Sequence, residues 1–117
     1  MHQVLVIDDE ESVSQVLQLG LTRFGFQAKT AFGGHEGLRL FDAGSFDLVI
    51  TDILMPDMDG YEVARRIRNS DRPRTPIIAI SGTPWLLDGS DEFDCVLPKP
   101  FSLNTLAEAV EDVMCSA

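Results

Sequence analysis

The sequence predicts an α/β fold, a doubly wound five-stranded parallel sheet with helices on both faces, and two observations lead to this prediction. Short apolar runs alternate with segments of helical periodicity along the whole chain, which is the order typical of parallel α/β sheets. The run at residues 76–81 is apolar without alternation, as expected for a parallel strand that helices cover on both sides. The length of 117 residues fits one domain, so we expect a single domain over residues 1–117.

The first half of the chain predicts three strands and two helices. Strands are expected at residues 4–7, 27–31 and 48–51, and the second helix at residues 36–43. The first helix follows the first strand and ends at Gly25, because glycine commonly terminates helices. Apolar side chains recur in this helix at spacings of three or four, which assigns them to one face: Val13, Val16, Leu17, Leu21 and Phe24.

The second half predicts two strands and two clear helices. Residues 61–69 have the pattern of an exposed helix lying on a sheet. A strand follows at residues 76–81, and a brief last strand at residues 96–97. Ser102 is the expected N-cap of the final helix. The apolar face of that helix is Leu103, Leu106, Ala107, Val110 and Met114.

Composition and charge restrict the partners and the location. The net charge of -10, from 19 acidic and 9 basic residues, argues against nucleic-acid and membrane-surface roles, because phosphate groups would be repelled. No apolar run is long enough to cross a bilayer, and the first residues lack a signal peptide, so we expect a cytoplasmic protein. Cys95 and Cys115 are too sparse for a zinc or redox motif and are expected to be free thiols.

Acidic residues follow two of the predicted strands. Asp8 and Asp9 come directly after the first strand, and Asp52 comes after the third. Carboxyl ends of parallel strands meet at one edge, where ligands of such sheets bind. Clustered carboxylates raise one another's pKa unless a cation is present, and ligands that are all oxygen favour magnesium. Ser81 and Lys99 follow the last two strands and add a hydroxyl and an amine to the same edge.

Taken together, these motifs resemble the receiver domain of two-component response regulators. The resemblance covers essentially the whole chain and implies a flavodoxin-like sheet with strand order 2-1-3-4-5. It rests on residues that are weak markers singly but specific in this order and spacing: Asp8-Asp9, Asp52 with Met55-Pro56 and Asp59-Gly60, Ser81, and Lys99-Pro100-Phe101.

The resemblance implies a phosphoacceptor and a magnesium site. Asp52 would take a phosphoryl group from a phosphohistidine on a histidine kinase or a histidine phosphotransfer protein. Asp9 and Asp52 would bind Mg²⁺ directly, with the backbone carbonyl of Leu54 as a third ligand. Asp8 would act mainly through water.

The resemblance also implies how the phosphoryl group is held and what it does. Lys99 would pair with one phosphoryl oxygen and Ser81 would hydrogen-bond to another, and the Lys99-Pro100 bond is often cis in similar proteins. Such a domain is a signalling switch rather than an enzyme, although it catalyses its own phosphorylation and dephosphorylation. Its output would be a protein target, or an effector domain if the chain is part of a longer regulator. Either a monomer or a phosphorylation-dependent homodimer is compatible with this role.

Two features depart from the pattern of the family. Val96 stands where an aromatic switch residue is usual. The segment between Ser81 and Lys99 is about one helical turn shorter than usual and rich in helix-breaking residues, so the fourth helix is expected to be short or irregular. Within it, Trp85, Leu86 and Leu87 either fill the gap that a short helix leaves or form a partner-binding patch.

Two alternatives remain beside the phosphorylatable receiver. A pseudo-receiver would act only as a protein-interaction module, which Val96 favours and the intact acidic pair opposes. A hydrolase of the haloacid dehalogenase type would need an Asp-x-Asp nucleophile motif. Asp57-x-Asp59 has that spacing but follows Pro56 rather than a strand. In the favoured interpretation Asp59 is only a turn residue.

Overall fold

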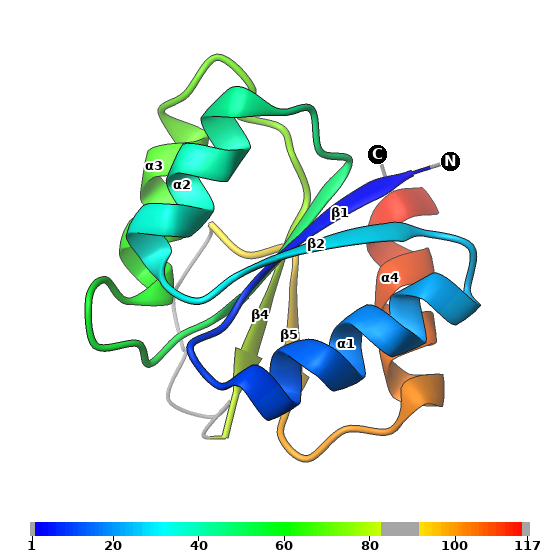
Figure 1. The fold of residues 1–117 in the computed structure, drawn as a ribbon. Coiled ribbons are helices and arrows are strands. Elements are labelled where there is room, and N and C mark those ends of the chain that lie inside the picture. Colours follow the sequence, from blue (N-terminus) through cyan, green and yellow to red (C-terminus); the bar gives the residue numbers. More distant parts are fainter. Residues whose placement is uncertain (1, 83–91, 116–117) are drawn as a thin grey trace.

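Five parallel strands form one sheet in the order β2-β1-β3-β4-β5, as predicted. The computed structural model describes residues 2–82 and 92–115, and Figure 1 shows their arrangement. Both β3 and β4 are buried along their whole length, which confirms the prediction made from the unbroken apolar run of β4. The strands are β1 (Gln3–Ile7), β2 (Gln27–Ala31), β3 (Leu48–Asp52), β4 (Ile77–Ser81) and β5 (Cys95–Pro98).

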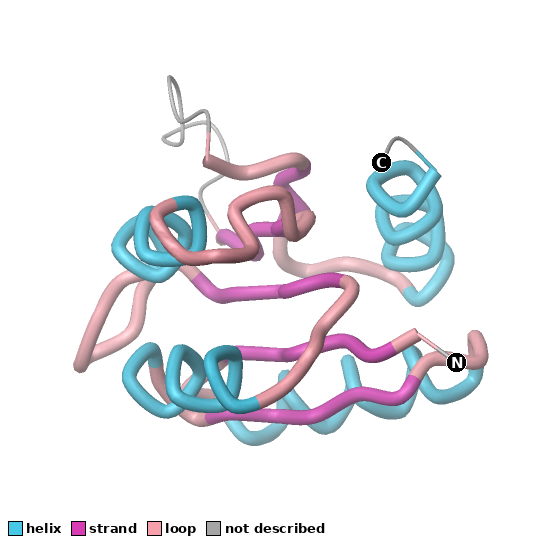
Figure 2. The backbone as a smooth tube through the Cα atoms, turned by 90° about the horizontal axis from the view of Figure 1, so that it is seen from above, coloured by secondary structure: helices cyan, strands magenta, loops and turns pink. Residues whose placement is uncertain are grey.

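Helices cover both faces of the sheet, as Figure 2 shows from above. The described part of the chain holds α1 (Glu11–Arg23), α2 (Gly34–Ala43), α3 (Gly60–Arg68) and α4 (Leu103–Cys115). The pair α1 and α4 lies on one face, and α2 and α3 lie on the other. None of these helices has the length and apolar character needed to span a bilayer. The predicted irregular fourth helix, with Trp85, Leu86 and Leu87, lies outside the described residues.

Two apolar layers hold the helices to the sheet, because alternate residues of a strand face opposite sides. Val4 and Val6 of β1 face α1 and α4, whereas Leu5 and Ile7 face α2 and α3. All four side chains have no exposed surface. A strand with both faces covered cannot slip in register without placing apolar side chains against the wrong layer. The register therefore fixes where each strand ends, and with it the position of the residues that follow.

The buried face of α1 differs from the one that its spacing predicts. Val16 is 51% exposed and Phe24, the C-cap residue, is 39% exposed. The helix instead buries Ser14, Leu17, Gly20 and Leu21. Gly20 lies so close to α4 that a Cβ atom there would come within 2.7 Å of Leu103 Cδ2. Gly20 thus belongs to the buried face, and Val16 lies outside it. Gly25, with φ of +90°, ends the segment in the left-handed conformation that glycine adopts readily.

Candidate functional site

The acidic residues meet at the carboxyl ends of β1 and β3, where the strand order reverses. In the parallel pairing of these strands, Ile7 lies opposite Thr51. Asp8 and Asp52 are the next residues in the chain, so they lie side by side. Sheets of this type bind ligands at such a switch point. Both residues are nearly inaccessible, with 0% of Asp8 and 5% of Asp52 exposed.

The carboxylate of Asp52 is held at both oxygens. Oδ1 accepts a hydrogen bond from the backbone N–H of Ile53 at 2.8 Å. Oδ2 lies 3.4 Å from the Nζ atom of Lys99, which donates to it. The last residue of β3 therefore holds a fixed carboxylate at the carboxyl edge of the sheet.

Lys99 reaches three carboxylates from the segment after β5. Its Nζ atom lies 3.4 Å from Asp52 Oδ2, 3.5 Å from Glu10 Oε1 and 3.9 Å from Asp8 Oδ2. Burial acts to lower the pKa of Lys99, but the three negative charges outweigh it, and the pKa lies above its ordinary value. The lysine is thus a permanent cation beside these three carboxylates. The Lys99-Pro100 peptide bond is cis, as the resemblance implied.

The surroundings of Asp8 disfavour the charged form of its carboxyl group. Its Oδ1 atom accepts a hydrogen bond from the Glu10 N–H at 2.9 Å. Its Oδ2 atom is buried and has no hydrogen-bond partner among the described residues. Burial, helped by the charge of Asp52, raises the pKa of Asp8 from 3.8 to about 6. A buried, unsatisfied carboxylate oxygen is costly unless a cation or donor meets it.

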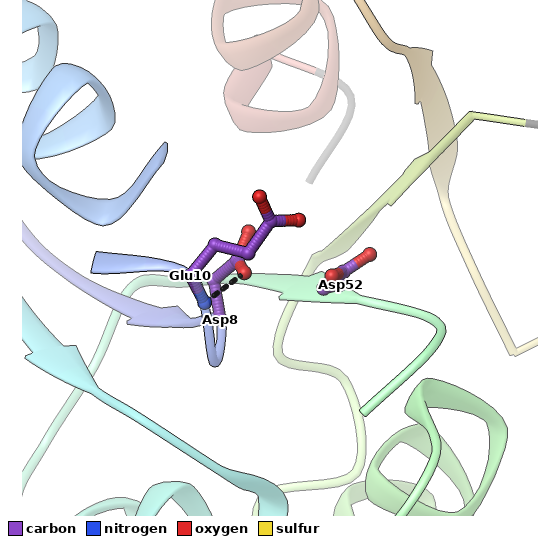
Figure 3. A group of neighbouring side chains, drawn as sticks. All are labelled: Asp8, Glu10 and Asp52. Carbon is purple, nitrogen blue, oxygen red and sulfur yellow. Dashed lines mark hydrogen bonds between the residues drawn. The ribbon is translucent and has the colours of Figure 1, made fainter. Parts of the chain in front are cut away.

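The residues of this group fit a magnesium ion. One oxygen each from Asp8, Glu10 and Asp52 lie within 4.8 Å of one another. Figure 3 shows the three carboxylates, two from the segment after β1 and one from the end of β3. An oxygen-only donor set with an unsatisfied buried oxygen suits a hard divalent cation. The acidic character predicted for this edge of the sheet is confirmed.

The structure adds Glu10 to the predicted set and leaves Asp9 outside it. Asp9 is exposed, and it is not part of the described group of converging carboxylates. Glu10 was missed because a glutamate at the start of a helix is ordinarily read as a surface charge. Its position two residues after Asp8 was the available signal. The assignment of Asp9 as a direct magnesium ligand stays a prediction.

Ser81 and Leu54 complete the set of predicted site residues. Ser81 ends β4, is 5% exposed, and accepts a hydrogen bond through its backbone carbonyl from the Lys99 N–H at 2.8 Å. This bond ties the serine and the lysine to the same edge. Leu54 lies two residues after Asp52 with its side chain 77% exposed. Val96 is half-buried within β5.

Comparison with known proteins identifies the family. The sequence profile of the response regulator receiver domain matches residues 4–111. The chain belongs to this family. Receiver domains serve two-component signal transduction, so the signalling role inferred from the resemblance is confirmed at that level.

Relatives and solved structures agree with this assignment. The receiver domain is 34% identical over 97% of its length to a probable transcriptional regulator, ycf27 of Cyanidium caldarium, and covers 46% of that protein. It is 37% identical to part of the sensor histidine kinase AtsR of Burkholderia thailandensis, covering 87% of this chain and 18% of the kinase. The chain thus spans about half the length, or less, of these curated relatives.

Two solved structures match over nearly the whole chain. The response regulator TrrA of Thermotoga maritima, in complex with Mg²⁺-BeF, is 35% identical with a TM-score of 0.88, over 97% of this chain and 99% of that one. The chemotaxis protein CheY4 of Vibrio cholerae is 30% identical with a TM-score of 0.89, over 97% and 98%. The flavodoxin-like receiver fold is therefore established.

The Asp57-x-Asp59 motif, on which the hydrolase hypothesis depends, has a structural role in this receiver domain. Asp57 accepts hydrogen bonds from the N–H groups of Gly34 and His35, and Asp59 accepts one from Glu62 N–H at 2.9 Å. Asp59 is the N-cap of α3 rather than a plain turn residue. Both carboxylates cap helices, so neither is placed as a nucleophile, and the hydrolase reading has no support.

Proposed function

We propose that this receiver domain is a phosphoacceptor switch in which Asp52 takes a phosphoryl group from a phosphohistidine of a histidine kinase or phosphotransfer protein. The observation that carries the proposal is the fixed, nearly buried carboxylate of Asp52, with Lys99 at 3.4 Å and Asp8 beside it. A carboxylate held beside a lysine ammonium and next to further carboxylate oxygens is suited to attack phosphorus.

The reaction is a displacement at phosphorus. An oxygen of Asp52 forms the new O–P bond as the P–N bond of the phosphohistidine breaks, and the imidazole nitrogen takes up a proton. Phosphoryl transfer depends mainly on position and on charge neutralisation. Since Asp52 is held at Oδ1 by Ile53 N–H, little reorganisation of the nucleophile is needed.

Each neighbouring residue has a part in neutralising charge. Lys99 would move from Asp52 Oδ2 to a phosphoryl oxygen, and the Ser81 hydroxyl would donate to another. Asp8, Glu10 and Asp52, with Asp9 and the Leu54 carbonyl as further predicted ligands, would hold Mg²⁺. Bound magnesium would offset the charge that develops on the phosphoryl oxygens.

A surface beside the site suits the phosphodonor protein. An open pocket of about 440 Å³ lies between α1 and the segment after β5, lined by Ser12, Val13, Val16, Lys99, Pro100 and Phe101. Val16 and Leu19 of α1 are large apolar residues exposed by 51% and 62%. A contiguous exposed apolar patch with a polar rim is typical of a protein-contact surface. Because Lys99 lines this pocket, a protein docked there would carry its phosphohistidine to Asp52.

Phosphorylation by a small-molecule donor tests the chemistry. The protein is incubated with acetyl phosphate and Mg²⁺, and its intact mass is measured, with Asp52→Asn as the matched variant. We expect one phosphoryl adduct that requires magnesium and is lost in the variant. An adduct that still forms in Asp52→Asn would contradict the assignment of Asp52 as the phosphoacceptor.

The same assay separates the switch from the pseudo-receiver, which stays the alternative because of Val96. A protein that gives no adduct under any condition, yet still binds a kinase, would be a pseudo-receiver.

The proposed docking surface on α1 is tested with Val16→Glu. This substitution should slow transfer from a phosphorylated kinase and leave the reaction with acetyl phosphate unchanged.

The proposed output is a conformational change that a protein target or an effector domain reads. The cytoplasmic location, the single domain over residues 1–117, and the choice between monomer and phosphorylation-dependent homodimer stay predictions.

A further inference from the structure

Helix α2 is capped at both ends by side chains from distant parts of the chain. Its own N-cap, Gly33, makes no side-chain cap. The carboxylate of Asp57 instead accepts hydrogen bonds from Gly34 N–H at 3.2 Å and His35 N–H at 3.0 Å. A negative group is favoured at this end because helix N-termini carry partial positive charge. These two N–H groups hold the pKa of Asp57 below its ordinary value.

The opposite end of α2 has the complementary charge. The guanidinium of Arg72 donates to the carbonyl of Phe41 at 2.5 Å and to that of Gly44. It also lies 4.5 Å from the centre of the Phe41 ring. A cation is favoured at a helix C-terminus. Asp57 and Arg72 therefore hold the two ends of one helix, but only Asp57 lies near the phosphoacceptor in the chain.

The loop that carries Asp57 packs directly against the first turn of α2. A Cβ atom at Gly33 would lie 2.9 Å from Asp57 Oδ2, and one at Gly34 would lie 2.7 Å from the Cβ of Met58. Such distances are shorter than real side chains tolerate, so two glycines in succession make the contact possible. The contact fixes the loop against a rigid element of the fold.

This loop begins at the phosphoacceptor. It starts directly after Asp52 and closes where Gly60 N–H donates to the Ile53 carbonyl at 2.8 Å. Met55 and Met58 are buried against the α2 and α3 side of the sheet. Leu54, the residue just before Met55, is exposed. The position of its backbone carbonyl therefore depends on where the two ends of the loop are held.

We propose that Asp57 is a positioning residue that fixes the loop of residues 53–59 on α2 and so holds the Leu54 carbonyl in place for the divalent cation. This inference rests on the proposed function, in which that carbonyl is a ligand. Asp59 caps α3 three residues ahead, whereas Asp57 bonds to residues 22 and 23 positions away. Losing Asp57 therefore frees the loop as well as the helix.

Magnesium binding to the unphosphorylated protein tests the inference, with calorimetric titration for affinity and thermal unfolding for stability. The test variants are Asp57→Ala, which removes the acceptor, and Gly34→Ala, which pushes Met58 and the loop away while Asp57 remains. Arg72→Met is the matched control, because it removes the cap from the other end of the same helix. Asp57→Asn keeps the shape and one carbonyl acceptor.

We expect magnesium affinity to fall roughly tenfold in Asp57→Ala and Gly34→Ala, the lower end of what supporting residues of metal sites contribute. Asp57→Asn should lie between these variants and the wild type. Arg72→Met should lose stability and keep its affinity within about twofold.

Two outcomes would overturn the inference, and they are distinguishable. If Asp57→Ala and Gly34→Ala bind magnesium as well as Arg72→Met does, Asp57 is a helix cap and nothing more, while the proposed function stands. If the wild type itself binds no magnesium, the proposed function fails and this inference fails with it. Should Asp57→Ala not fold, Gly34→Ala and Asp57→Asn give the same decision.

Discussion

Replacing Asp8 by asparagine should stabilise the metal-free protein at neutral pH. Asp8 is fully buried, and its Oδ2 atom has no hydrogen-bond partner in the described part of the chain. Its pKa rises from 3.8 to about 6 on folding, because burial disfavours the charged form. Ionised Asp8 therefore opposes folding, and Asp8→Asn removes that charge with little change in shape.

The pH dependence follows from the direction of this shift. Between pH 4 and pH 6 the unfolded chain releases the proton of Asp8 while the folded protein keeps it, so stability falls as pH rises through this range. Each pKa unit corresponds to about 1.4 kcal/mol, so a shift from 3.8 to about 6 costs about 3 kcal/mol above pH 6. The buried asparagine amide costs part of this gain, which leaves about 2 kcal/mol.

Urea unfolding followed by circular dichroism, at a series of pH values with a chelator present, measures the effect. The quantity to plot is the free energy of unfolding of Asp8→Asn minus that of the wild type, since titrating groups distant from Asp8 cancel in this difference. It should be close to zero near pH 4 and rise to about 2 kcal/mol at pH 7. Asp9→Asn, which removes a carboxylate from the exposed neighbouring position, is the matched control.

Excess magnesium should stabilise the wild type more than Asp8→Asn, and so reduce or reverse the stability difference between them. A ligand that binds only the folded state adds stability, and Asp8→Asn lacks a carboxylate of the cation site. The wild type should therefore gain more stability from magnesium than the variant does. A difference curve that stays flat, or that falls as pH rises, would refute the claim that buried Asp8 is an electrostatic cost.

Three further substitutions probe the surroundings of the site. Lys99→Met should lower the metal-free stability by about 1–2 kcal/mol in urea unfolding, because its carboxylate neighbours lose their cation, and magnesium should reduce that loss. Asp59→Ala should cost about 1 kcal/mol by removing the cap of α3 and leave the phosphoryl adduct in intact-mass measurement unchanged. Gly60→Ala should cost about 2 kcal/mol or more, because its Cβ would lie 2.5 Å from the Asp52 carbonyl oxygen, and it should also slow adduct formation by displacing Asp52.

The sequence was sufficient to predict the sheet because each strand carries its own signal. The apolar run of β4 has no alternation, and all five residues of the strand are buried. Once the order of strands is given, the residues that follow them must converge, because parallel strands end at one edge. Asp8, Asp52, Ser81 and Lys99 were therefore predictable as a group before any side chain was placed.

Side-chain directions at the end of β1 could not be predicted in the same way. Successive residues alternate in direction within a strand, but this rule ends where the strand ends. Glu10 N–H bonds back to Asp8 Oδ1, a local turn that brings the Glu10 carboxylate toward Lys99 and leaves Asp9 exposed. Spacing alone cannot distinguish two neighbouring acidic residues in a turn.

Contacts between helices and distant parts of the chain could not be predicted from the sequence either. Helical spacing assigned Val16 to the buried face of α1, yet that face contains Gly20, whose missing side chain admits Leu103. The Asp57 cap of α2 joins residues 22 and 23 positions apart. Such contacts depend on which surfaces the fold brings together, and a local pattern does not contain that information.

The arrangement of Lys99 and its three carboxylate neighbours favours an order of events in the proposed reaction. One ammonium group faces three carboxylates, at 3.4, 3.5 and 3.9 Å, so Lys99 offsets only part of their charge. A phosphoryl group brings further negative charge and would meet a net repulsive site. If Lys99 turned to the phosphoryl oxygens before magnesium had bound, the three carboxylates would lose the lysine ammonium that offsets part of their charge. We therefore expect magnesium to bind before the phosphodonor, because only then can Lys99 leave Asp52 without exposing three adjacent negative charges.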